Sequence, residues 1–459
     1  MNKKYDSLFK ELISSYYSED NFDEKLNDIV KNNFNSKEDA IDVLSSLCGV
    51  DIDKNSDNIA YDIRKAITTH KIKKNIVDKV SVCTKNCSKE SICTKNCSKE
   101  SKGKCQSLCP FDAILTDPID NSKYIDPNLC QNCGICVQVC ESGHFLDRIE
   151  LLPIIDLIKN NETVIAAVAP AIAGQFGENV SLDMLREAFI KIGFSDMIEV
   201  AFAADMLSIK EAVEFNHHVE KTGDILITSC CCPMWVAMLR KCYTDLVKDV
   251  SPSVSPMIAA GRVIKKLNKD AKVVFIGPCI AKKAEAREKD LVGAIDYVLT
   301  FEELKGIFEA LKIDPSSMKG VPSIEYTSRG GRLYARTGGV SEAINDVVKE
   351  LYPDKAKIFK AVQANGVKEC KELLNKVQSG ELKANFIEGM GCVGGCVGGP
   401  KRIVDPSIGK KHVDEVAYNS PIKVATHSHT MDEVLLRLGI NSLKSFEDKE
   451  KISIFEREF

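Results

Sequence analysis

The sequence predicts an α/β domain that follows a small, cysteine-rich α+β domain and a short helical segment. After Glu150, apolar runs of strand length alternate with amphipathic stretches of helical length, the pattern of α/β folds. Residues 81–150 carry closely spaced cysteines, and no glycine precedes Gly49 in a segment with helix-like apolar spacing. A chain of 459 residues with 44% apolar residues can form about three such domains. We therefore predict domains at 1–80, 81–150 and 151–459.

Charge and cysteine content narrow the class of protein. The net charge of -4 is too small to indicate nucleic acid or a membrane surface as partner. The longest apolar stretch, Val164–Gly174, is much shorter than the roughly 20 residues of a membrane span. Cysteine occurs 19 times without a charged and apolar leader ahead of it, which favours reduced, metal-bound thiols in a cytoplasmic protein.

The first 80 residues predict a small helical extension. Ser36, with Asp39 three residues later, resembles a capping box that opens a helix through Ala40–Leu44. Cys48 is expected to pack as a buried apolar residue. The sequence assigns no chemistry to this segment.

Residues 81–150 contain two cysteine patterns. The stretch Cys-Thr-Lys-Asn-Cys-Ser-Lys-Glu-Ser occurs twice, starting at Cys83 and at Cys93. Further on, Cys130–Cys140 has the C-x2-C-x2-C-x3-C spacing that binds a 4Fe4S cube in bacterial ferredoxins. In two-cluster ferredoxins the fourth cysteine of each run crosses to the other cube, so Cys109, which precedes Pro110, would complete this one. The predicted ligands of the first cube are Cys130, Cys133, Cys136 and Cys109.

The partner cube is predicted from a less regular pattern. It would take Cys140, the fourth cysteine of the run Cys130–Cys140, together with Cys105 and one Cys-x3-Cys pair of the repeat. Of the two copies of the repeat, we favour the one with Cys93 and Cys97, because it lies nearer to Cys105 in the chain than the copy with Cys83 and Cys87. Zinc binding by these pairs is the alternative. The favoured ligands are Cys140, Cys105, Cys97 and Cys93, and a ferredoxin-like domain with two cubes predicts electron transfer.

The α/β region delivers further cysteines at strand ends. Asp224–Ile227, Val273–Ile276 and Asn385–Ile387 are short apolar runs, each followed by cysteine beside Pro or Gly. Open α/β sheets bind ligands at the carboxyl ends of strands, and glycine lets the backbone approach a ligand closely. Val164–Pro170 predicts another buried strand, and Ser181–Ile192 predicts an amphipathic helix capped by its serine. Three strands are thus expected to bring four thiolates to one place.

Three stretches of this region resemble the three signature motifs of the iron-only (FeFe) hydrogenases. They are TSCCCPMW from Thr228, GPCIAKKAEA from Gly277 and EGMGCVGGCVGG from Glu388. The resemblance covers residues 81–400 and includes the ferredoxin-like spacing. The additional cysteine in the first motif, glycine before Pro278 and proline at position 400 are similar to a divergent subgroup often called group B. The resemblance implies an H-cluster, a 4Fe4S cube joined by a cysteine sulfur to a di-iron unit with CO, cyanide and a bridging azadithiolate.

The resemblance also implies which residues hold this cluster. Cys396 would bridge the cube to the di-iron unit, and Lys282 would hydrogen-bond a cyanide ligand, a role that suits an ammonium in a dry site. A surface position is the alternative for this lysine. Ala169, Pro170 and Met390 match residues around the di-iron unit, with plain core packing as the alternative. The implied cube ligands are Cys232, Cys279, Cys392 and Cys396.

Proton delivery to a buried metal site needs titratable groups in hydrogen-bond succession. Cys231 matches the family thiol that passes protons to the azadithiolate, with the additional Cys230 as the alternative donor. Glu211 and Glu214 lie three residues apart on one helix face. Together with Ser251 they resemble the family relay, in the order Glu211, Ser251, Glu214 from the thiol to solvent. Without the resemblance, such a glutamate pair predicts a solvated helix face.

Two functions follow from these expectations. The first is a hydrogenase that exchanges electrons with a ferredoxin or a similar small carrier and needs the hydrogenase maturation proteins. The second is a non-catalytic relative, either a redox or dihydrogen sensor or an iron-sulfur assembly factor. Lys282, Cys231 and the glutamate pair favour the first.

The segment after Pro400 predicts a closing strand and helix, and structural roles are expected for Cys242, Cys370, His217 and His218.

Overall fold

The computed structural model describes residues 4–18, 21–69, 73, 75–81, 104–160, 162–221, 223–228 and 231–459. They form two compact units. The first comprises Met1–Glu162, Cys279–Ala284 and Glu302–Asp314, and the second comprises Thr163–Pro278, Glu285–Phe301 and Pro315–Phe459. Within the described ranges, no helix is both long and apolar enough to cross a membrane. The domain boundaries near residues 80 and 150 stay predictions.

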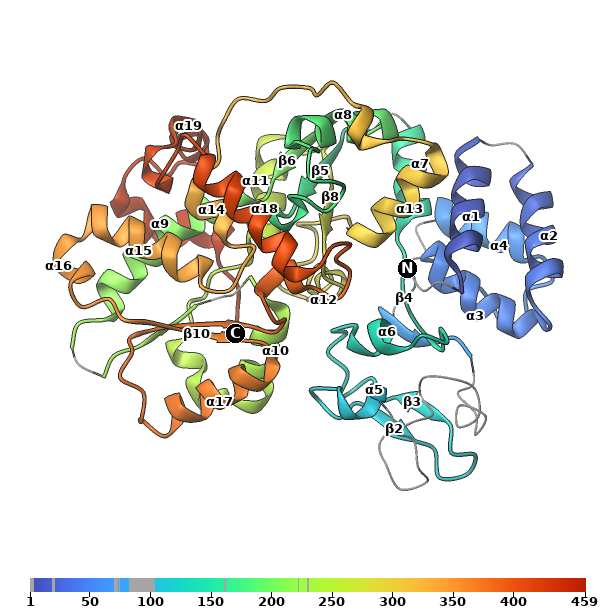
Figure 1. Cartoon of the computed structure of the whole chain (residues 1–459), viewed down its shortest axis with the longest axis horizontal. Coiled ribbons are helices and arrows are strands. Elements are labelled where there is room, and N and C mark those ends of the chain that lie inside the picture. Colours follow the sequence, from blue (N-terminus) through green and yellow to red (C-terminus); the bar gives the residue numbers. More distant parts are fainter. Residues whose placement is uncertain are drawn as a thin grey trace. The chain divides into compact units, whose positions relative to one another are not determined.

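Four helices open the first unit, in agreement with the helical extension predicted for this segment (Figure 1). They are α1 (Asp6–Ser18), α2 (Phe22–Asn33), α3 (Lys37–Cys48) and α4 (Ile59–Thr68), and α7 (Leu151–Lys159) packs against α1 and α4. Ser36 caps α3, because its side chain accepts a hydrogen bond from the backbone N–H of Asp39 at 3.2 Å. Gly49 ends that helix with a φ of +71°, and a Cβ there would lie 2.2 Å from the carbonyl oxygen of Ile149. Only glycine therefore fits this helix end.

The rest of the first unit contains a small α+β fold, which confirms the predicted class of the cysteine-rich region. β1 (Val77–Lys79) pairs antiparallel with β4 (Phe145–Asp147), and β2 (Ile114–Thr116) pairs antiparallel with β3 (Lys123–Ile125). The short helices α5 (Lys104–Ser107) and α6 (Ile135–Val139) each contain a cysteine. The core of this fold is made by Ile76, Val77, Ile114, Cys136, Val137, Phe145 and Ile280.

Two parallel sheets form the centre of the second unit, as expected of an α/β fold. The larger has the strand order β6-β5-β8-β9, with β5 (Val164–Val168), β6 (Asp196–Glu199), β8 (Lys272–Gly277) and β9 (Tyr297–Thr300). The smaller has the order β10-β11-β7, with β7 (Leu226–Ile227), β10 (Ala361–Asn365) and β11 (Phe386–Met390). The three strands that precede the predicted cube ligands, β7, β8 and β11, therefore belong to two sheets.

Helices connect the strands of the second unit. Ser181 caps the first of them by accepting a hydrogen bond from the Met184 N–H at 3.2 Å, and Gly193 ends it with a φ of +115°, as predicted. The helices between the strands are α8 (Leu182–Ile192), α9 (Ala201–His218), α10 (Pro233–Cys242), α11 (Pro256–Leu267), α14 (Arg329–Leu333), α15 (Gly339–Leu351), α16 (Pro353–Ala356) and α17 (Val367–Gln378).

The closing part of the second unit is helical, so the strand predicted after Pro400 is wrong. It contains α18 (Pro406–Asn419), α19 (His429–Arg437) and α20 (Lys449–Ile452). The first two begin at side-chain caps, because Asp405 accepts a hydrogen bond from the Ser407 N–H and Ser428 accepts one from the Met431 N–H. Strand-like pairing here is limited to an isolated bridge between Ser253 and Glu456.

A buried ion-pair network fixes the start of α12 (Ala281–Glu285) in the first unit. Lys283 is fully buried, and its Nζ lies 2.8 Å from Oδ2 of Asp147 and 2.6 Å from Oε1 of Glu303, which belongs to α13 (Phe301–Leu311). Burial acts to lower the pKa of Lys283, but the two carboxylates raise it above its ordinary value. The ammonium therefore stays charged and holds β4, α12 and α13 together.

Replacing Lys283 with Met should destabilise the first unit strongly. The change leaves two buried carboxylates without their counter-ion, which costs about 3–5 kcal/mol of unfolding free energy. Chemical denaturation followed by circular dichroism measures this loss. The matched control is Lys305→Met, because this lysine of α13 is 52% exposed and pairs with Glu309 at 4.0 Å. Its loss should cost less than about 1 kcal/mol, and an equally small loss in both variants would contradict the role of the network.

Candidate functional site

Four thiols of the first unit line one small cavity, together with apolar side chains such as Ile125. Burial and the charges of neighbouring thiols raise the pKa of Cys133 to about 12. Cys109 and Cys130 are among those neighbours, and the same causes raise the pKa of Cys136. The structure therefore brings together the four cysteines predicted to bind the first cube.

Backbone N–H groups point at the sulfur atoms of this region. Ala113 N–H donates to Cys109 Sγ at 3.3 Å, and His144 N–H donates to Cys140 Sγ at 3.3 Å. Such donors favour the thiolate, the form that binds iron. Cys105 and Cys140, predicted for the partner cube, both pack against the core of this fold. The other predicted or alternative ligands of that cube lie outside the described residues: Cys83, Cys87, Cys93 and Cys97.

Cys279 lies beside the same group of thiols. Its charge is a further cause of the raised pKa of Cys133. The next residue, Ile280, is fully buried in the core that contains Cys136. A Cβ on Gly134 would lie 2.2 Å from Cδ1 of Ile280, so glycine is required where the cysteine loop meets this side chain. One predicted H-cluster ligand is thus within electrostatic range of a predicted ligand of the accessory cube.

Neighbouring parallel strands bring two further thiols to one edge of the smaller sheet. β7 and β11 pair at Leu226–Phe386 and Ile227–Ile387, and Cys232 and Cys392 follow these two strands. The Gly391 N–H donates to Cys232 Sγ at 3.3 Å. Because the carboxyl ends of adjacent parallel strands meet at one edge, the turn that carries Cys392 reaches the sulfur of Cys232.

Glycines shape the turn that carries Cys392 and Cys396. A Cβ on Gly391 would lie 2.7 Å from Cβ of Met234, and Gly395 has a φ of +84° with the Thr337 nitrogen 2.6 Å from its Cβ position. Side chains at these positions would therefore displace the turn. Soft thiolates carried on a glycine-rich turn suit an iron-sulfur cluster, because glycine lets the backbone come close to it. In the described ranges no three His, Cys, Asp or Glu side chains could hold a single metal ion, whereas a cube spaces its thiolates around four irons.

Glu211 and Glu214 project from α9, as predicted, but their environments differ. Glu211 is 3% exposed and accepts a hydrogen bond from the Thr228 hydroxyl. Burial, followed by the charge of Glu214, raises the pKa of Glu211 to about 7. Glu214 is half-buried and accepts a hydrogen bond from Ser251 Oγ at 2.6 Å. The solvated-face interpretation is thus wrong for Glu211, and the predicted relay residues lie in one polar cluster.

Cys231 lies near the same polar cluster. It is buried, as is Tyr334, which directly follows α14. Burial and then the charges of Glu211 and Cys231 raise the pKa of Tyr334, which places both groups around this ring. The Tyr334 hydroxyl lies 3.0 Å from Ser208 Oγ. The alternative donor, Cys230, lies outside the described residues.

The residues predicted to surround the di-iron unit are distributed over both units. Ala169 is buried and Pro170 is half-buried directly after β5, and Met390 is buried at the end of β11. Cys370 is buried as well, and its Sγ donates to the Met390 carbonyl at 3.4 Å, a structural role as expected. Lys282 is only 6% exposed in the first unit, so the surface alternative for this lysine is wrong.

Sequence reasoning missed three members of the polar cluster in the second unit. Thr228 donates to Glu211, Lys210 is fully buried one residue before it, and Ser253 lies two residues after Ser251. The signal for Lys210 is its position between Ile209 and Glu211 on a helix with mostly apolar or small neighbours. The signal for Thr228 and Ser253 is weaker, because a hydroxyl in a loop is usually a local cap.

Family models match both parts of the chain. The model described as iron only hydrogenase large subunit, C-terminal domain, matches residues 162–400, and the model described as 4Fe-4S binding domain matches residues 123–143. The chain is 28% identical over 327 residues to the NADP-reducing hydrogenase subunit HndD of Solidesulfovibrio fructosivorans, covering 59% of this chain and 55% of that protein. It is 28% identical over 313 residues to iron hydrogenase 1 of Clostridium pasteurianum, covering 57% and 54%. The chain therefore spans about half the length of these two relatives.

Further similarities concern the fold and a second class of protein. A variant of the FeFe-hydrogenase HydA1 from Chlamydomonas reinhardtii matches with a TM-score of 0.50 and 26% identity, covering 60% of this chain and 89% of that chain. The cytosolic iron-sulfur assembly component 3 of Mus musculus is 21% identical over 353 residues, covering 63% of this chain and 74% of that protein. Similar proteins thus include both hydrogenases and an assembly component.

Replacing Cys133 with Ser should remove one cube from the first unit. Its thiol lies among the other predicted ligands, so the variant is expected to bind about four irons fewer per chain after anaerobic reconstitution. The control is Cys48→Ala. Burial alone raises the pKa of Cys48 to about 12, without a thiol neighbour as a cause, so its loss should leave the iron content unchanged. Unchanged iron in the Cys133 variant would contradict the cluster assignment.

The raised pKa of Glu211 predicts a stability that depends on pH. The folded state holds the proton up to about pH 7, while the unfolded glutamate releases it near 4.5, so stability falls as the pH rises between these values and levels off above them. Glu211→Gln should remove this contribution, which is at most roughly 3 kcal/mol. Denaturation at about pH 5 and about pH 7.5 measures it. The exposed Glu220→Gln serves as control, and the same pH dependence in the Glu211 variant as in the wild type would refute the prediction.

Proposed function

The chain belongs to the iron-only hydrogenase large-subunit family, and we propose on that premise that it catalyses the reversible reduction of protons to dihydrogen. The observation that carries the proposal is the polar cluster of buried Glu211, buried Ser251 and half-buried Glu214. A titratable path into a protein interior serves proton transfer. A protein that only carries iron-sulfur clusters has no need of one.

The proposed reaction site is an H-cluster. When bound, the di-iron unit supplies the redox chemistry at which protons and electrons combine. Lys282 would offer a buried ammonium to this unit, and Ala169, Pro170 and Met390 would pack around it and keep water out. Cys232, Cys279, Cys392 and Cys396 would hold the cube through their thiolates, and Cys396 would also hold the di-iron unit.

Glu211 is the proposed centre of proton transfer in the second unit. A pKa of about 7 lets this carboxyl accept and release protons near neutral pH. Cys231 would hold the proton at its Sγ on the inner side of Glu211. Ser251 and Glu214 would carry it on the outer side, since Ser251 donates a hydrogen bond to Glu214 at 2.6 Å.

Electrons would reach the site through the first unit. Cys109, Cys130, Cys133 and Cys136 would hold one 4Fe4S cube, and the partner cube would use Cys93, Cys97, Cys105 and Cys140. The electrostatic effect of Cys279 on Cys133 within the first unit is consistent with this proposal. We propose a ferredoxin or similar small carrier as the electron partner and the hydrogenase maturation proteins as the source of the di-iron unit. The functional division would follow residues 1–80, 81–150 and 151–459.

A role in iron-sulfur assembly is the second candidate, favoured by the similarity to the assembly component of Mus musculus. Such a protein would keep the thiolate ligands. It would not need a buried lysine after Cys279, a buried thiol before Cys232 or a carboxyl that titrates near neutral pH. Lys282, Cys231 and Glu211 are all buried, and together they favour the hydrogenase.

Cys231→Ser and Glu211→Gln should each keep the clusters and lose turnover. Removing one group from a proton relay costs about 100-fold or more in rate, because no neighbour takes over the transfer. Dihydrogen evolution from a reduced dye, measured beside iron content, tests this. Cys242→Ser, which changes an exposed thiol, is the control and should stay active. Full turnover in Cys231→Ser would move the donor role to Cys230, and full turnover in Glu211→Gln would contradict the proposed route.

A further inference from the structure

A fully buried lysine lies beside the proposed proton route. Lys210 of α9 has an exposed fraction of 0%, and its Nζ lies 3.3 Å from Oε1 of Glu456. It also donates to a carboxylate oxygen of Glu214 and, at 3.2 Å, to Ser253 Oγ. Burial acts to lower the pKa of Lys210, but Glu214, Glu456 and Glu211 raise it above its ordinary value. The side chain is therefore a permanent cation in the protein interior.

Ser253 connects the two glutamates of α9. Its hydroxyl lies close enough to the Glu211 carboxyl to lower the pKa of that group, and it lies 2.8 Å from Ser251 Oγ. Ser251 in turn donates to Glu214 at 2.6 Å. Hydrogen bonds therefore join Ser253, Ser251 and Glu214, and Ser253 neighbours Glu211 at the inner end of this series. The order predicted from the sequence contained only one of these serines.

The segment Phe455–Arg457 holds the loop that carries both serines. The Val254 N–H donates to the Phe455 carbonyl at 2.8 Å, and the Arg457 N–H donates to the Pro252 carbonyl at 2.8 Å. Between these bonds, Ser253 and Glu456 face each other in an isolated antiparallel bridge. The carboxylate that pairs with Lys210 and the backbone of Ser253 are thus fixed by the same contact.

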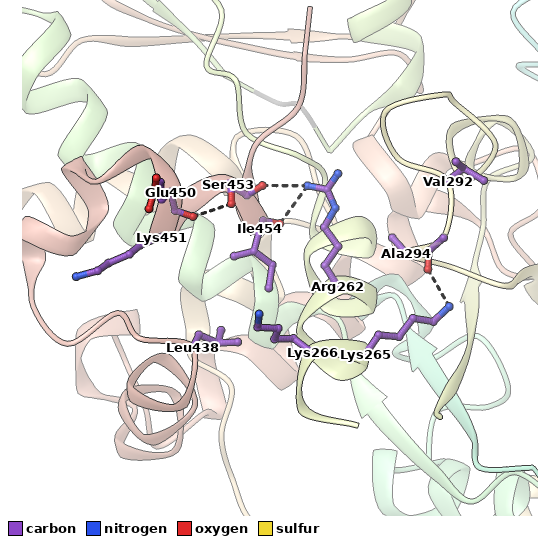
Figure 2. A pocket seen from close by; sticks show the side chains of 11 residues that line it. Arg262, Lys265, Lys266, Val292, Ala294, Leu438, Glu450, Lys451, Ser453 and Ile454 are labelled. Carbon is purple, nitrogen blue, oxygen red and sulfur yellow. Dashed lines mark hydrogen bonds between the residues drawn. The ribbon is translucent and has the colours of Figure 1, made fainter. Parts of the chain in front are cut away.

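Arg262 of α11 anchors this segment from a neighbouring pocket. Figure 2 shows its guanidinium next to the backbone of Ser453 and Ile454, whose carbonyls accept hydrogen bonds from it at 3.3 and 3.2 Å. It also donates to the Glu456 carbonyl at 2.7 Å and to the Asp290 carbonyl at 2.9 Å. These acceptors are all backbone oxygens. Arg262 therefore stabilises the backbone of this segment and positions Glu456, which pairs with Lys210.

We propose that Ser253 is an additional link in the proton relay and that Lys210 is the positioning residue that sets the direction of its hydrogen bonds. This inference rests on the proposed function and extends it from one relay hydroxyl to two. An ammonium only donates hydrogen bonds. Ser253 Oγ must therefore accept from Lys210, which leaves the single hydrogen of the serine for the relay.

In the proposed relay, the donors and acceptors are matched both before and after the proton moves. With the proton on Glu211, the carboxyl donates to Ser253, Ser253 donates to Ser251, and Ser251 donates to the Glu214 carboxylate. Moving one hydrogen along each bond places the proton on Glu214 and reverses every donor. In both states Ser253 Oγ accepts two hydrogen bonds, one of them from Lys210, and donates one. One proton passes between the glutamates, and neither serine is left charged.

An infrared titration of Glu211 tests the arrangement without requiring an active enzyme. The sample is the full chain with reconstituted iron-sulfur clusters and no di-iron unit, and the carboxyl band of Glu211 is the one that disappears in Glu211→Gln. Among the described residues, the groups that act on or contact Glu211 include Lys210, Glu214, Thr228, Ser253 and Tyr334. Lys210 and Ser253 lower the pKa of Glu211. Lys210→Met and Ser253→Ala should therefore each raise the titration midpoint, by about one pH unit.

Ser255→Ala is the matched control, because Ser255 is a buried serine of the same loop that caps α11 by accepting from the Ile258 N–H at 3.4 Å. It should leave the midpoint unchanged even if it lowers stability. In protein with a di-iron unit, Ser253→Ala should slow exchange between dihydrogen and heavy water at least about tenfold. Ser253→Thr, which keeps a hydroxyl, should restore both the midpoint and the rate. Lys210→Gln replaces the Met variant if the latter does not fold.

Unchanged midpoints in folded Lys210 and Ser253 variants would overturn the inference, and so would a Ser253→Ala enzyme with full exchange. The titration separates this failure from failure of the proposed function. Shifted midpoints in a protein that never shows dihydrogen exchange would support the placement of Ser253 and Lys210 and reject the hydrogenase function.

Discussion

Burying an ionisable carboxyl is costly unless its oxygens find partners, and the second unit is arranged around this constraint at Glu211. Thr228, which donates to Glu211, directly follows β7, and its backbone N–H donates to the Ile387 carbonyl of β11 at 2.8 Å. Trp235 holds the same turn, since its Nε1 donates to the Thr228 carbonyl at 2.8 Å. The strands that precede Cys232 and Cys392 therefore also set the environment of Glu211.

This coupling explains why glycine is required at several positions near the site. A Cβ on Gly389 would lie 2.2 Å from the ring of Trp235, so a larger residue in β11 would displace the indole and with it the turn at Thr228. In the first unit, Gly134 likewise leaves room for Ile280, because a Cβ there would lie 2.2 Å from Cδ1 of that side chain. In both units, glycine therefore lets the backbone near cysteine-bearing turns pack closely against other elements.

The local parts of this architecture could be predicted from the sequence, because their signals lie within a few residues. Cysteine spacing indicated the group formed by Cys109, Cys130, Cys133 and Cys136, and the capping serines marked the starts of α3 and α8. The partners of Lys210 and Ser253 include Glu456, which is remote in the chain, so no local pattern reveals them. The burial of Glu211 was likewise invisible, because an i,i+3 glutamate pair normally lies on a solvated helix face.

The most direct test of the central claim is an infrared spectrum of the anaerobically purified chain, coexpressed with hydrogenase maturation proteins, in the region where metal-bound CO and cyanide absorb. If the proposed di-iron unit is present, bands should appear in this region and shift when dihydrogen is added, because the H-cluster implied by the resemblance carries CO and cyanide. A spectrum without such bands, from protein whose iron-sulfur absorption is intact, would contradict the hydrogenase function and favour a role in iron-sulfur assembly.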